Sequence, residues 1–274
     1  MKNIVLITGG GKRLGSLIAK ELSKESFHIV LHYNKSEKQA LETKDEIIKN
    51  GGKIDLIRKE ITSENDAMDL IGESINFLED VENQQFTLIN NASAFKYDQG
   101  HDFTENILDE HIHANFKIPA LLVKSLNKQL NEKFNGNVIN MLDAKIFGLN
   151  PDHYTYTLSK FALLGLTKVA ALSYSPKLRV NGIAPGFTLP NPEHGAKDFK
   201  RIQKLNPLLK GPNPSDVINA VKFLIKTLSI TGENILIDGG AHLSPQKKRC
   251  NFFIEKRIVW DYLKIKNRKF ILKI

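Results

Sequence analysis

The feature that most constrains the fold is a regular alternation of short apolar runs with longer stretches of helical period. Strands are predicted at Asn3–Thr8, Phe27–Tyr33, Lys53–Lys59, Phe86–Asn90, Asn137–Leu142, Leu178–Ala184 and Asn234–Asp238. Helices are predicted between them at Leu14–Ser26, Lys38–Asn50, Glu64–Glu79, Thr104–Asn131, His153–Ser173 and Pro214–Leu228. Several apolar runs are unbroken, as expected of parallel strands that are buried on both faces.

This order predicts a single Rossmann-type doubly wound α/β domain, with about seven parallel strands and helices on both faces of the sheet. The 274 residues are compatible with one such domain. We place the domain at residues 1–244 and a basic C-terminal extension at 245–274. The connection from Pro185 to Pro214 is rich in proline and glycine. It is predicted to be an irregular lid or binding loop beside the carboxyl end of a strand.

Composition limits the setting of the protein. The single cysteine, Cys250, excludes an internal disulfide and favours a reducing, cytoplasmic location. No apolar run approaches the roughly 20 residues needed to span a bilayer, and the N-terminus lacks a signal-like apolar segment. His111, His113 and His153 follow no metal-ligand spacing, so no metal site is expected.

The net charge of +9 comes almost entirely from the C-terminal extension. That extension has ten lysines and arginines against two acids, a net charge of +8, which leaves +1 for the rest of the chain. Basic residues interleaved with aromatic ones can bind nucleic acid or anionic surfaces. Because the whole chain is rich in Lys, Ile and Asn, we expect no specific nucleic-acid or membrane partner.

A glycine-rich loop joins the first predicted strand to the first predicted helix. It reads Thr8, Gly9, Gly10, Gly11, Lys12, Arg13, Leu14, Gly15. Glycines allow backbone N–H groups to approach a pyrophosphate, and the helix N-terminus favours its negative charge. The position between strand and helix favours a dinucleotide site over a plain turn.

The end of the second predicted strand bears on the choice of dinucleotide. It reads His32, Tyr33, Asn34, Lys35, Ser36, with no acid before Glu37. An NAD site usually places Asp or Glu here for the ribose hydroxyls. Arg13, Lys35 and Ser36 would instead suit a 2′-phosphate, so NADP(H) is predicted. The alternative is that Lys35 and Ser36 are ordinary solvated residues.

Tyr156 and Lys160 lie four residues apart in a predicted helix, and Asp143 ends the fifth predicted strand. At this spacing the two side chains share a helix face, so the ammonium is predicted to lower the pKa of the phenol. Such a phenol can donate a proton during reduction of a polar double bond. Asn115 and the segments Asn90–Phe95 and Asn181–Gly186 also fall at strand or helix ends, so all can converge on one crevice.

Taken in order, these motifs resemble the short-chain dehydrogenase/reductase family over residues 3–243. Within it, the chain looks most like the pteridine reductases and bacterial dihydromonapterin reductases. Four features carry that resemblance: Gly-Lys-Arg-Leu-Gly in the loop, His-Tyr-Asn-Lys-Ser after the second strand, Phe95 after Asn-Ala-Ser-Ala, and Asp143 in place of the usual serine.

The resemblance implies roles for individual residues. Asp143, Tyr156, Lys160 and Asn115 would be catalytic. Arg13, Ser93, Phe95, Asp143 and Tyr156 would bind substrate, with Phe95 stacked on a pterin ring. The cofactor would be held by Thr8, Gly9, Lys12, Arg13, Leu14, Gly15, His32, Tyr33, Asn34, Lys35, Ser36, Glu60, Asn91, Ala92, Ser93, Tyr156, Lys160, Pro185 and Gly186. A homotetramer built through the helices at 104–131 and 153–173 is also implied.

The predicted function is NADPH-dependent reduction of a dihydropterin, such as dihydromonapterin or dihydrobiopterin, with dihydrofolate as a further candidate. A carboxylate can accept pterin N–H groups or help to deliver a proton to ring nitrogen. The alternatives are a carbonyl reductase of the 3-oxoacyl-thioester or sugar-alcohol type, and a non-catalytic NADPH-binding regulator.

Several residues also have simpler interpretations. Asp143 could be a capping acid, and Phe95 could be a core residue. Tyr154 could compete with Tyr156, although only Tyr156 has a lysine four residues later. Glu60 stands where relatives usually have Asp.

Overall fold

The computed structural model describes residues 3–25, 27–79, 84–190 and 196–244. They form one seven-stranded parallel sheet with the order β3-β2-β1-β4-β5-β6-β7. The strands are β1 (Ile4–Ile7), β2 (His28–Tyr33), β3 (Lys53–Arg58), β4 (Gln85–Asn90), β5 (Asn135–Met141), β6 (Leu178–Pro185) and β7 (Asn234–Ile237). This confirms the predicted doubly wound α/β domain.

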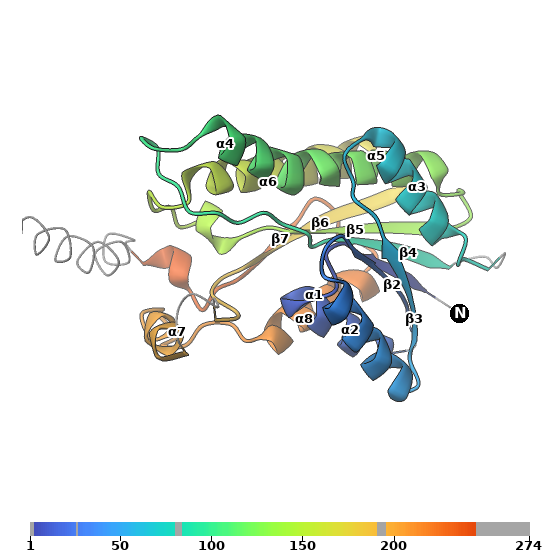
Figure 1. The fold of residues 1–274 in the computed structure, drawn as a ribbon, viewed down its shortest axis with the longest axis horizontal. Helices are drawn as coiled ribbons and strands as arrows, with labels where there is room; N and C mark the ends of the chain where they lie inside the picture. Colours follow the sequence, from blue (N-terminus) through green and yellow to red (C-terminus); the bar gives the residue numbers. More distant parts are fainter. Residues whose placement is uncertain (1–2, 26, 80–83, 191–195, 245–274) are drawn as a thin grey trace, which may run out of the picture.

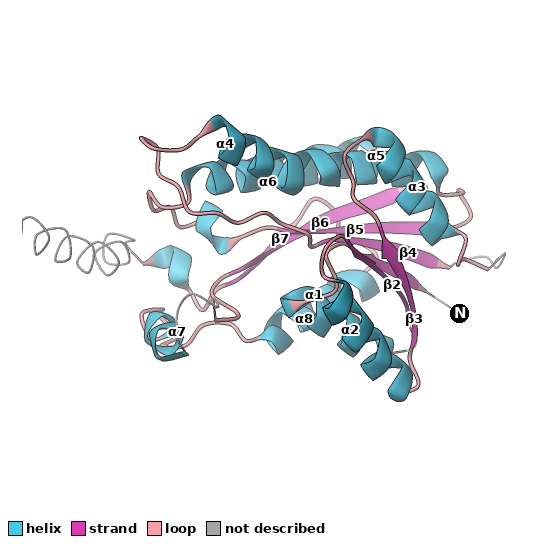
Figure 2. Ribbon diagram, in the orientation of Figure 1, coloured by secondary structure: helices cyan, strands magenta, loops and turns pink. Residues whose placement is uncertain are grey.

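Helices cover both faces of the sheet (Figures 1 and 2). One face carries α1 (Arg13–Ser23), α2 (Glu37–Lys49) and α8 (Pro214–Lys226). The other carries α3 (Glu64–Ile75), α4 (Glu105–Ile112), α5 (Ile118–Gln129) and α6 (Tyr154–Ser173). None of the described helices is long and apolar enough to cross a membrane.

Each sheet face has its own apolar core, because side chains alternate between the faces of a strand. In β1, Val5 and Ile7 pack with α1, α2 and α8, whereas Ile4 and Leu6 pack with α3, α5 and α6. Burial on both faces explains why β1 reads as an unbroken apolar run, and why every residue of β2 and β4 is buried.

The strand order reverses direction at β1, which pairs with β2 on one side and β4 on the other. In an open parallel sheet, the crevice at the carboxyl ends of the strands beside such a reversal is the usual ligand site. The glycine loop after β1 and the Asn90–Phe95 segment after β4 therefore meet at this point.

Two helical predictions differ from the structure. The segment predicted as one helix over Thr104–Asn131 is interrupted by the π-helical turn η1 (His113–Lys117). Pro119 follows this turn and has no N–H to give to the carbonyl of Asn115, which disfavours an unbroken α-helix there. The Pro185–Pro214 connection also contains α7 (Ala196–Gln203), in a stretch without glycine or proline. The extension at 245–274 lies outside the described residues.

Candidate active site

The glycine loop after β1 packs closely against the loop after β4. Gly9 has φ +60°, and a Cβ there would lie 2.9 Å from the Ala92 Cα. The Asn91 side chain donates to the carbonyls of Thr8 and Gly9 at 3.0 and 3.2 Å. The Thr8 hydroxyl accepts from the N–H of Asn91 and of Ala92. The predicted residues of these two segments therefore hold one another in place.

The N-terminus of α1 suits an anion. Among the described residues, its N-cap Lys12 makes no side-chain capping bond, and its first turn has no acidic residue. The first N–H groups of the helix are therefore available, and the helix dipole favours negative charge beside them. Lys12 and Arg13 are exposed there. Leu14 packs against the core and Gly15 is buried, so both support the loop.

The 2′-phosphate of a bound NADP(H) would lie near the end of β2. Lys35 is exposed, and Ser36 begins α2. The Ser36 hydroxyl lies 2.8 Å from where a Cβ on Gly11 would be, so it faces the glycine loop. Asn34 donates to Glu60 at 3.4 Å. These positions fit the predicted 2′-phosphate site of NADP(H).

His32 and Tyr33, the last two residues of β2, support the candidate cofactor site through buried contacts. The His32 ring is buried; its Nε2 donates to the Lys59 carbonyl at 2.9 Å, and its Nδ1 accepts from the Gly9 N–H at 3.4 Å. Burial lowers the His32 pKa, which favours this neutral form. The Tyr33 side chain lies in the apolar core, so only its backbone can face a cofactor.

Asp143 and Tyr156 come together as predicted. The Tyr156 hydroxyl donates to Asp143 Oδ2 at 2.8 Å. The other carboxylate oxygen, Oδ1, accepts from the Lys145 N–H at 2.8 Å and caps the short helix η2 (Ala144–Ile146). The capping role foreseen as an alternative is thus real, and it leaves one oxygen for the tyrosine.

Lys160 is 3% exposed, and its ammonium donates to the Met141 carbonyl at 2.8 Å. The ammonium lies 5.6 Å from the centre of the Tyr156 ring. Burial lowers the Lys160 pKa to about 8, opposed by the negative charge of Asp143. The helix-face prediction for Tyr156 and Lys160 is confirmed.

The predicted lowering of the Tyr156 pKa is wrong for the protein without ligands. Burial raises the pKa of this phenol well above its usual value, and the charge and hydrogen bond of Asp143 raise it further. The carboxylate disfavours a tyrosinate beside it, and this effect was not foreseen because the sequence does not show that the two groups touch. Tyr156 is therefore protonated across the physiological range.

Asn115 lies in the π-helical turn and joins the loop after β4 to α6. Its Oδ1 accepts from the Ser93 hydroxyl at 3.0 Å and from the Ala94 N–H at 2.8 Å. Its Nδ2 donates to the Ala94 carbonyl and to the Ser159 hydroxyl at 2.9 Å. π-Helical turns are frequent at functional sites. In this structure Asn115 organises the site around Tyr156 rather than touching its hydroxyl.

Phe95 stands at the mouth of the site rather than in the core. Its side chain is 53% exposed, and its ring meets the Tyr156 ring edge-on, with ring centres 4.7 Å apart. His153 stacks on it, with ring centres 4.3 Å apart. Tyr154 instead stacks with Phe103 and is half-exposed, so it does not replace Tyr156. His153 was not predicted to be part of the site, because its contact with Phe95 spans more than fifty residues.

Arg13 joins the glycine loop to the long connection after β6. Its guanidinium donates to the Pro190 carbonyl at 3.2 Å. Gly186 follows β6, where a Cβ would lie 3.0 Å from the Asp238 Cα. Pro185 and Gly186 therefore lie on the same strand edge as the other predicted residues.

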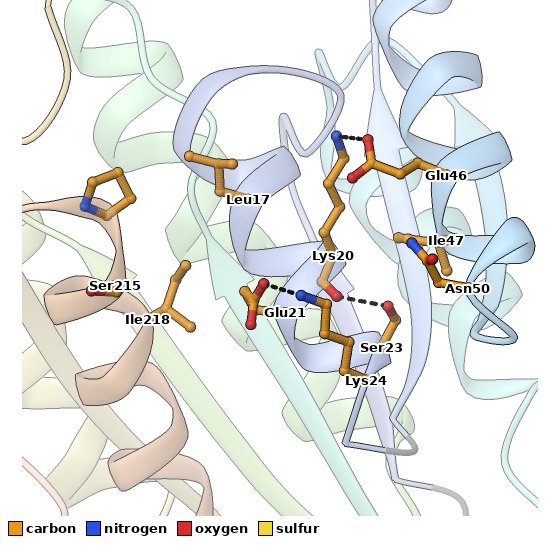
Figure 3. Close-up of a pocket in the computed structure, with 11 residues that line it drawn as sticks. Leu17, Lys20, Glu21, Ser23, Lys24, Glu46, Ile47, Asn50, Ser215 and Ile218 are labelled. Atoms are coloured by element: carbon orange, nitrogen blue, oxygen red, sulfur yellow. Dashed lines mark hydrogen bonds and ion pairs between the residues drawn. The ribbon is translucent and has the colours of Figure 1, made fainter.

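A separate hollow of about 330 Å³ lies between α1, α2 and α8 (Figure 3). Ion pairs of Lys20 with Glu46 and of Lys24 with Glu21 line it, and it includes none of the predicted site residues. The described residues contain no group of three or more His, Cys, Asp or Glu arranged to hold a metal ion.

Comparison with known proteins agrees with this geometry. The family model described as short chain dehydrogenase matches residues 3–199. The chain belongs to the short-chain dehydrogenase/reductase family. It is therefore an oxidoreductase of that family, as the motifs at Gly9, Tyr156 and Lys160 indicated.

Two solved structures resemble this short-chain dehydrogenase. FolM alternative dihydrofolate reductase 1 from Brucella canis, complexed with NADP, is 32% identical with a TM-score of 0.81, over 88% of this chain and 94% of that chain. The Brucella suis protein, also with NADP, has the same identity and TM-score and is covered to 96%. Among curated sequences, the 3-oxoacyl-[acyl-carrier-protein] reductase FabG of Staphylococcus epidermidis is 27% identical over 89% of this chain and all of its own length.

Proposed function

We propose that this protein is an NADPH-dependent pterin reductase that converts a dihydropterin to a tetrahydropterin. Dihydromonapterin and dihydrobiopterin are the first candidate substrates, and dihydrofolate is a further one. The observation that carries the proposal is the 2.8 Å hydrogen bond from the Tyr156 hydroxyl to the Asp143 carboxylate. The likeness to two FolM alternative dihydrofolate reductases with NADP supports both substrate class and cofactor.

The chain offers a complete set of groups for NADPH. The α1 N-terminus with Lys12 would hold the pyrophosphate, and Arg13, Lys35 and Ser36 would hold the 2′-phosphate. Lys160 would hold the nicotinamide ribose. When bound, NADPH supplies a hydride to a ring carbon of the pterin.

The carboxylate and the phenol suit reduction of a C=N bond. Hydride addition to carbon leaves the electron pair of the broken π bond on the ring nitrogen, which must take up a proton. A nitrogen anion is a stronger base than an alkoxide, so even a phenol with a raised pKa can protonate it. Tyr156 is held in its protonated form by burial and by Asp143. The Asp143 carboxylate can also accept N–H groups of the pterin, which a serine hydroxyl does less well.

The site mouth is suited to a flat, polar ring. The half-exposed Phe95 ring offers a stacking surface, and its centre lies 4.7 Å from that of the Tyr156 ring. Arg13 and Ser93 flank the same crevice from the glycine loop and from the loop after β4. Because these groups come from three separate segments, the site can hold one ring between the stacking residue and the cofactor.

The second candidate function is reduction of a 3-oxoacyl thioester, which the similarity to FabG favours. One assay separates the two. NADPH oxidation is followed with dihydromonapterin, dihydrobiopterin or dihydrofolate, and in parallel with an acetoacetyl thioester. We expect turnover of a dihydropterin. Turnover of the thioester alone would contradict the pterin proposal, and turnover of neither, with NADPH still bound, would favour a non-catalytic regulator.

A further inference from the structure

His111, in the last turn of α4, is fully buried beside the site but belongs to none of the roles above. Its ring contacts three residues from two other parts of the chain. It bonds to Lys96 in the loop after β4 and to Thr155 in the first turn of α6. It also meets the Tyr156 ring edge-on, with ring centres 5.9 Å apart.

The partners of His111 fix where its proton lies. The Lys96 backbone N–H can only donate, so Nε2 must accept at 3.0 Å. In the neutral ring, Nδ1 then carries the proton and donates to the Thr155 hydroxyl at 2.7 Å. Thr155 in turn donates its own hydroxyl proton to Asp98. The hydrogen bonds run in one direction from Lys96 through His111 and Thr155 to Asp98.

This chain of bonds joins the 94–98 loop to the first turn of the catalytic helix. The buried Asp98 carboxylate accepts from the Thr155 N–H at 3.2 Å, and the Lys96 carbonyl accepts from the His153 ring at 3.1 Å. The same loop contains Phe95, whose ring touches His153 and Tyr156. The position of Phe95 relative to Tyr156 therefore depends on these bonds.

We propose that His111, in its neutral Nδ1–H form, is a positioning residue that holds the 94–98 loop, and with it Phe95, in register with Tyr156. The inference rests on the proposed function, because it assigns to Phe95 the face of the substrate ring. It adds a residue that touches neither substrate nor cofactor but sets the position of the stacking ring relative to the proton donor.

The cationic form of His111 does not fit this arrangement. Both ring nitrogens would then be donors, and Nε2–H would face the Lys96 N–H at the present 3.0 Å. Asp98 and Glu110 favour the cation, whereas Lys96, His153 and above all burial oppose it, so the pKa of His111 is lowered. The neighbouring Tyr156 stays uncharged. Acid is thus expected to release the loop only below the ordinary pKa of histidine.

The tautomer can be tested without any substrate. Nitrogen NMR of protein labelled with ¹⁵N in its histidine rings distinguishes Nδ1–H from Nε2–H, and the His111→Gln spectrum identifies the signal. We expect Nδ1–H at pH 7.5 and a titration midpoint below that of free histidine. An Nε2–H ring, or a ring that is cationic at pH 7, would overturn the inference.

Two variants test the two ring nitrogens of His111 separately. Gln can place its carbonyl where Nε2 accepts from Lys96, whereas Asn can place its amide where Nδ1 donates to Thr155. His111→Gln loses only the bond to Thr155, so we expect KM for the dihydropterin to stay within about threefold. His111→Asn loses the bond to Lys96 in the 94–98 loop, so we expect KM to rise about tenfold, the usual effect of one lost hydrogen bond. The dissociation constant for NADPH is expected to stay unchanged in both. Equal KM values in the two variants would overturn the inference.

The pH profile separates positioning from mere stability. Wild-type protein is expected to lose kcat/KM for the dihydropterin in acid as His111 is protonated, and His111→Gln is expected to lack that component. The matched control is His113→Gln, because His113 lies two residues on in the same helical segment but bonds to the Ile61 carbonyl. An acid limb that is identical in wild type and His111→Gln would overturn the inference. If wild type reduces no dihydropterin, the proposed function fails, and the NMR titration still decides the state of His111.

Discussion

At the scale of single residues, the decisive observation is that the two oxygens of Asp143 have different partners. One caps η2 through the Lys145 N–H and the other accepts from Tyr156. The cap fixes the carboxylate in place, so its charge acts on the phenol at a constant distance. A residue that looked either structural or functional in the sequence both caps a helix and contacts the candidate proton donor in the fold.

Replacing Asp143 tests this division. Asp143→Ser is expected to lower kcat/KM for a dihydropterin by at least about 100-fold, since proton management of this kind commonly contributes that much. NADPH binding, measured by fluorescence titration, is expected to be unchanged.

Asp143→Asn is the matched control for the cap. Its amide oxygen can still accept from the Lys145 N–H, but it carries no charge for the site. We expect the thermal stability of wild type together with the activity loss of the serine variant. Full dihydropterin turnover in either variant would show that the carboxylate is not needed.

The lowered pKa of Lys160 predicts a pH dependence. The ammonium is the form expected to hold the nicotinamide ribose, and it loses its proton as pH rises through about 8. The kcat/KM for NADPH, which reports the free enzyme, should therefore fall above that pH. Tyr156 does not account for this limb, because its pKa lies well above 10.

Lys160→Arg provides the comparison, because a guanidinium stays charged throughout the accessible range. Whatever its absolute rate, its profile is expected to lack the alkaline fall. A wild-type profile that stays flat to pH 9.5 would contradict the assignment.

At the scale of elements, the helix ends show how side chains replace missing backbone bonds. Arg179 of β6 donates to the carbonyls of Leu224, Thr227 and Ile230, at and after the end of α8. The Leu224 and Thr227 carbonyls belong to the last turn and C-cap of α8, where intrahelical partners are missing. The Ile230 carbonyl also accepts from the Asn181 side chain at 2.9 Å. One half-buried guanidinium thus joins the sheet to α8, which packs against α1 behind the glycine loop.

Arg179→Met is expected to destabilise the fold by about 3 kcal/mol, because it removes the guanidinium donor from the Leu224 and Thr227 carbonyls. The melting temperature should fall by about 5 to 10 °C in differential scanning fluorimetry. The matched control is Arg58→Met on β3, whose side chain is 65% exposed and pairs with Glu37 at 3.6 Å. That exposed pair should contribute less than about 1 kcal/mol. Equal losses in the two variants would contradict the capping argument.

Element boundaries were predictable only where periodicity was uniform. The strand β2 and helix α6 differ from their predicted ends by one residue at most. The π-helical turn at His113–Lys117 escaped prediction, because its apolar spacing is close to that of an α-helix. α7 escaped because prolines and glycines on both sides gave the whole connection an irregular character.

At the scale of the whole molecule, one face of α6 carries apolar side chains that are exposed in the described part of the chain. Tyr154, Leu158, Phe161, Val169 and Leu172 are exposed along it, Val169 by 65% and Leu172 by 84%. Gly165 lies in the same stripe and leaves it flat. A hollow of about 400 Å³ opens beside Leu158 and Phe161. A long apolar stripe on a single chain indicates an interface.

We therefore expect the protein to be a homo-oligomer, a tetramer by family resemblance, with α6 in an interface. Leu172→Glu together with Val169→Glu should lower the mass found by analytical ultracentrifugation, because two charges would be buried without partners. The matched control is Leu41→Glu on α2, an exposed leucine on the opposite side of the sheet. A wild-type monomer, or an oligomer unaffected by the α6 double variant, would contradict this expectation.

The sequence alone determined the doubly wound sheet, the glycine loop and the set of candidate residues. Those properties depend on periodicity and on short motifs, which are local along the chain. The predicted NADP(H) agrees with the NADP in both Brucella structures. The assignment of Lys35, Ser36 and the substrate residues remains a prediction.

Only the tertiary structure decided which of these residues touch. The direction of the Tyr156 pKa, the exposure of Phe95, the bond from Arg13 to Pro190 and the path from Lys96 through His111 to Asp98 all join distant segments. Hydrogen bonds and electrostatic effects act over a few ångströms of space, and sequence separation does not reveal that distance. The geometry of the site therefore depends on contacts between β4, β5, α6 and the loops that follow the strands.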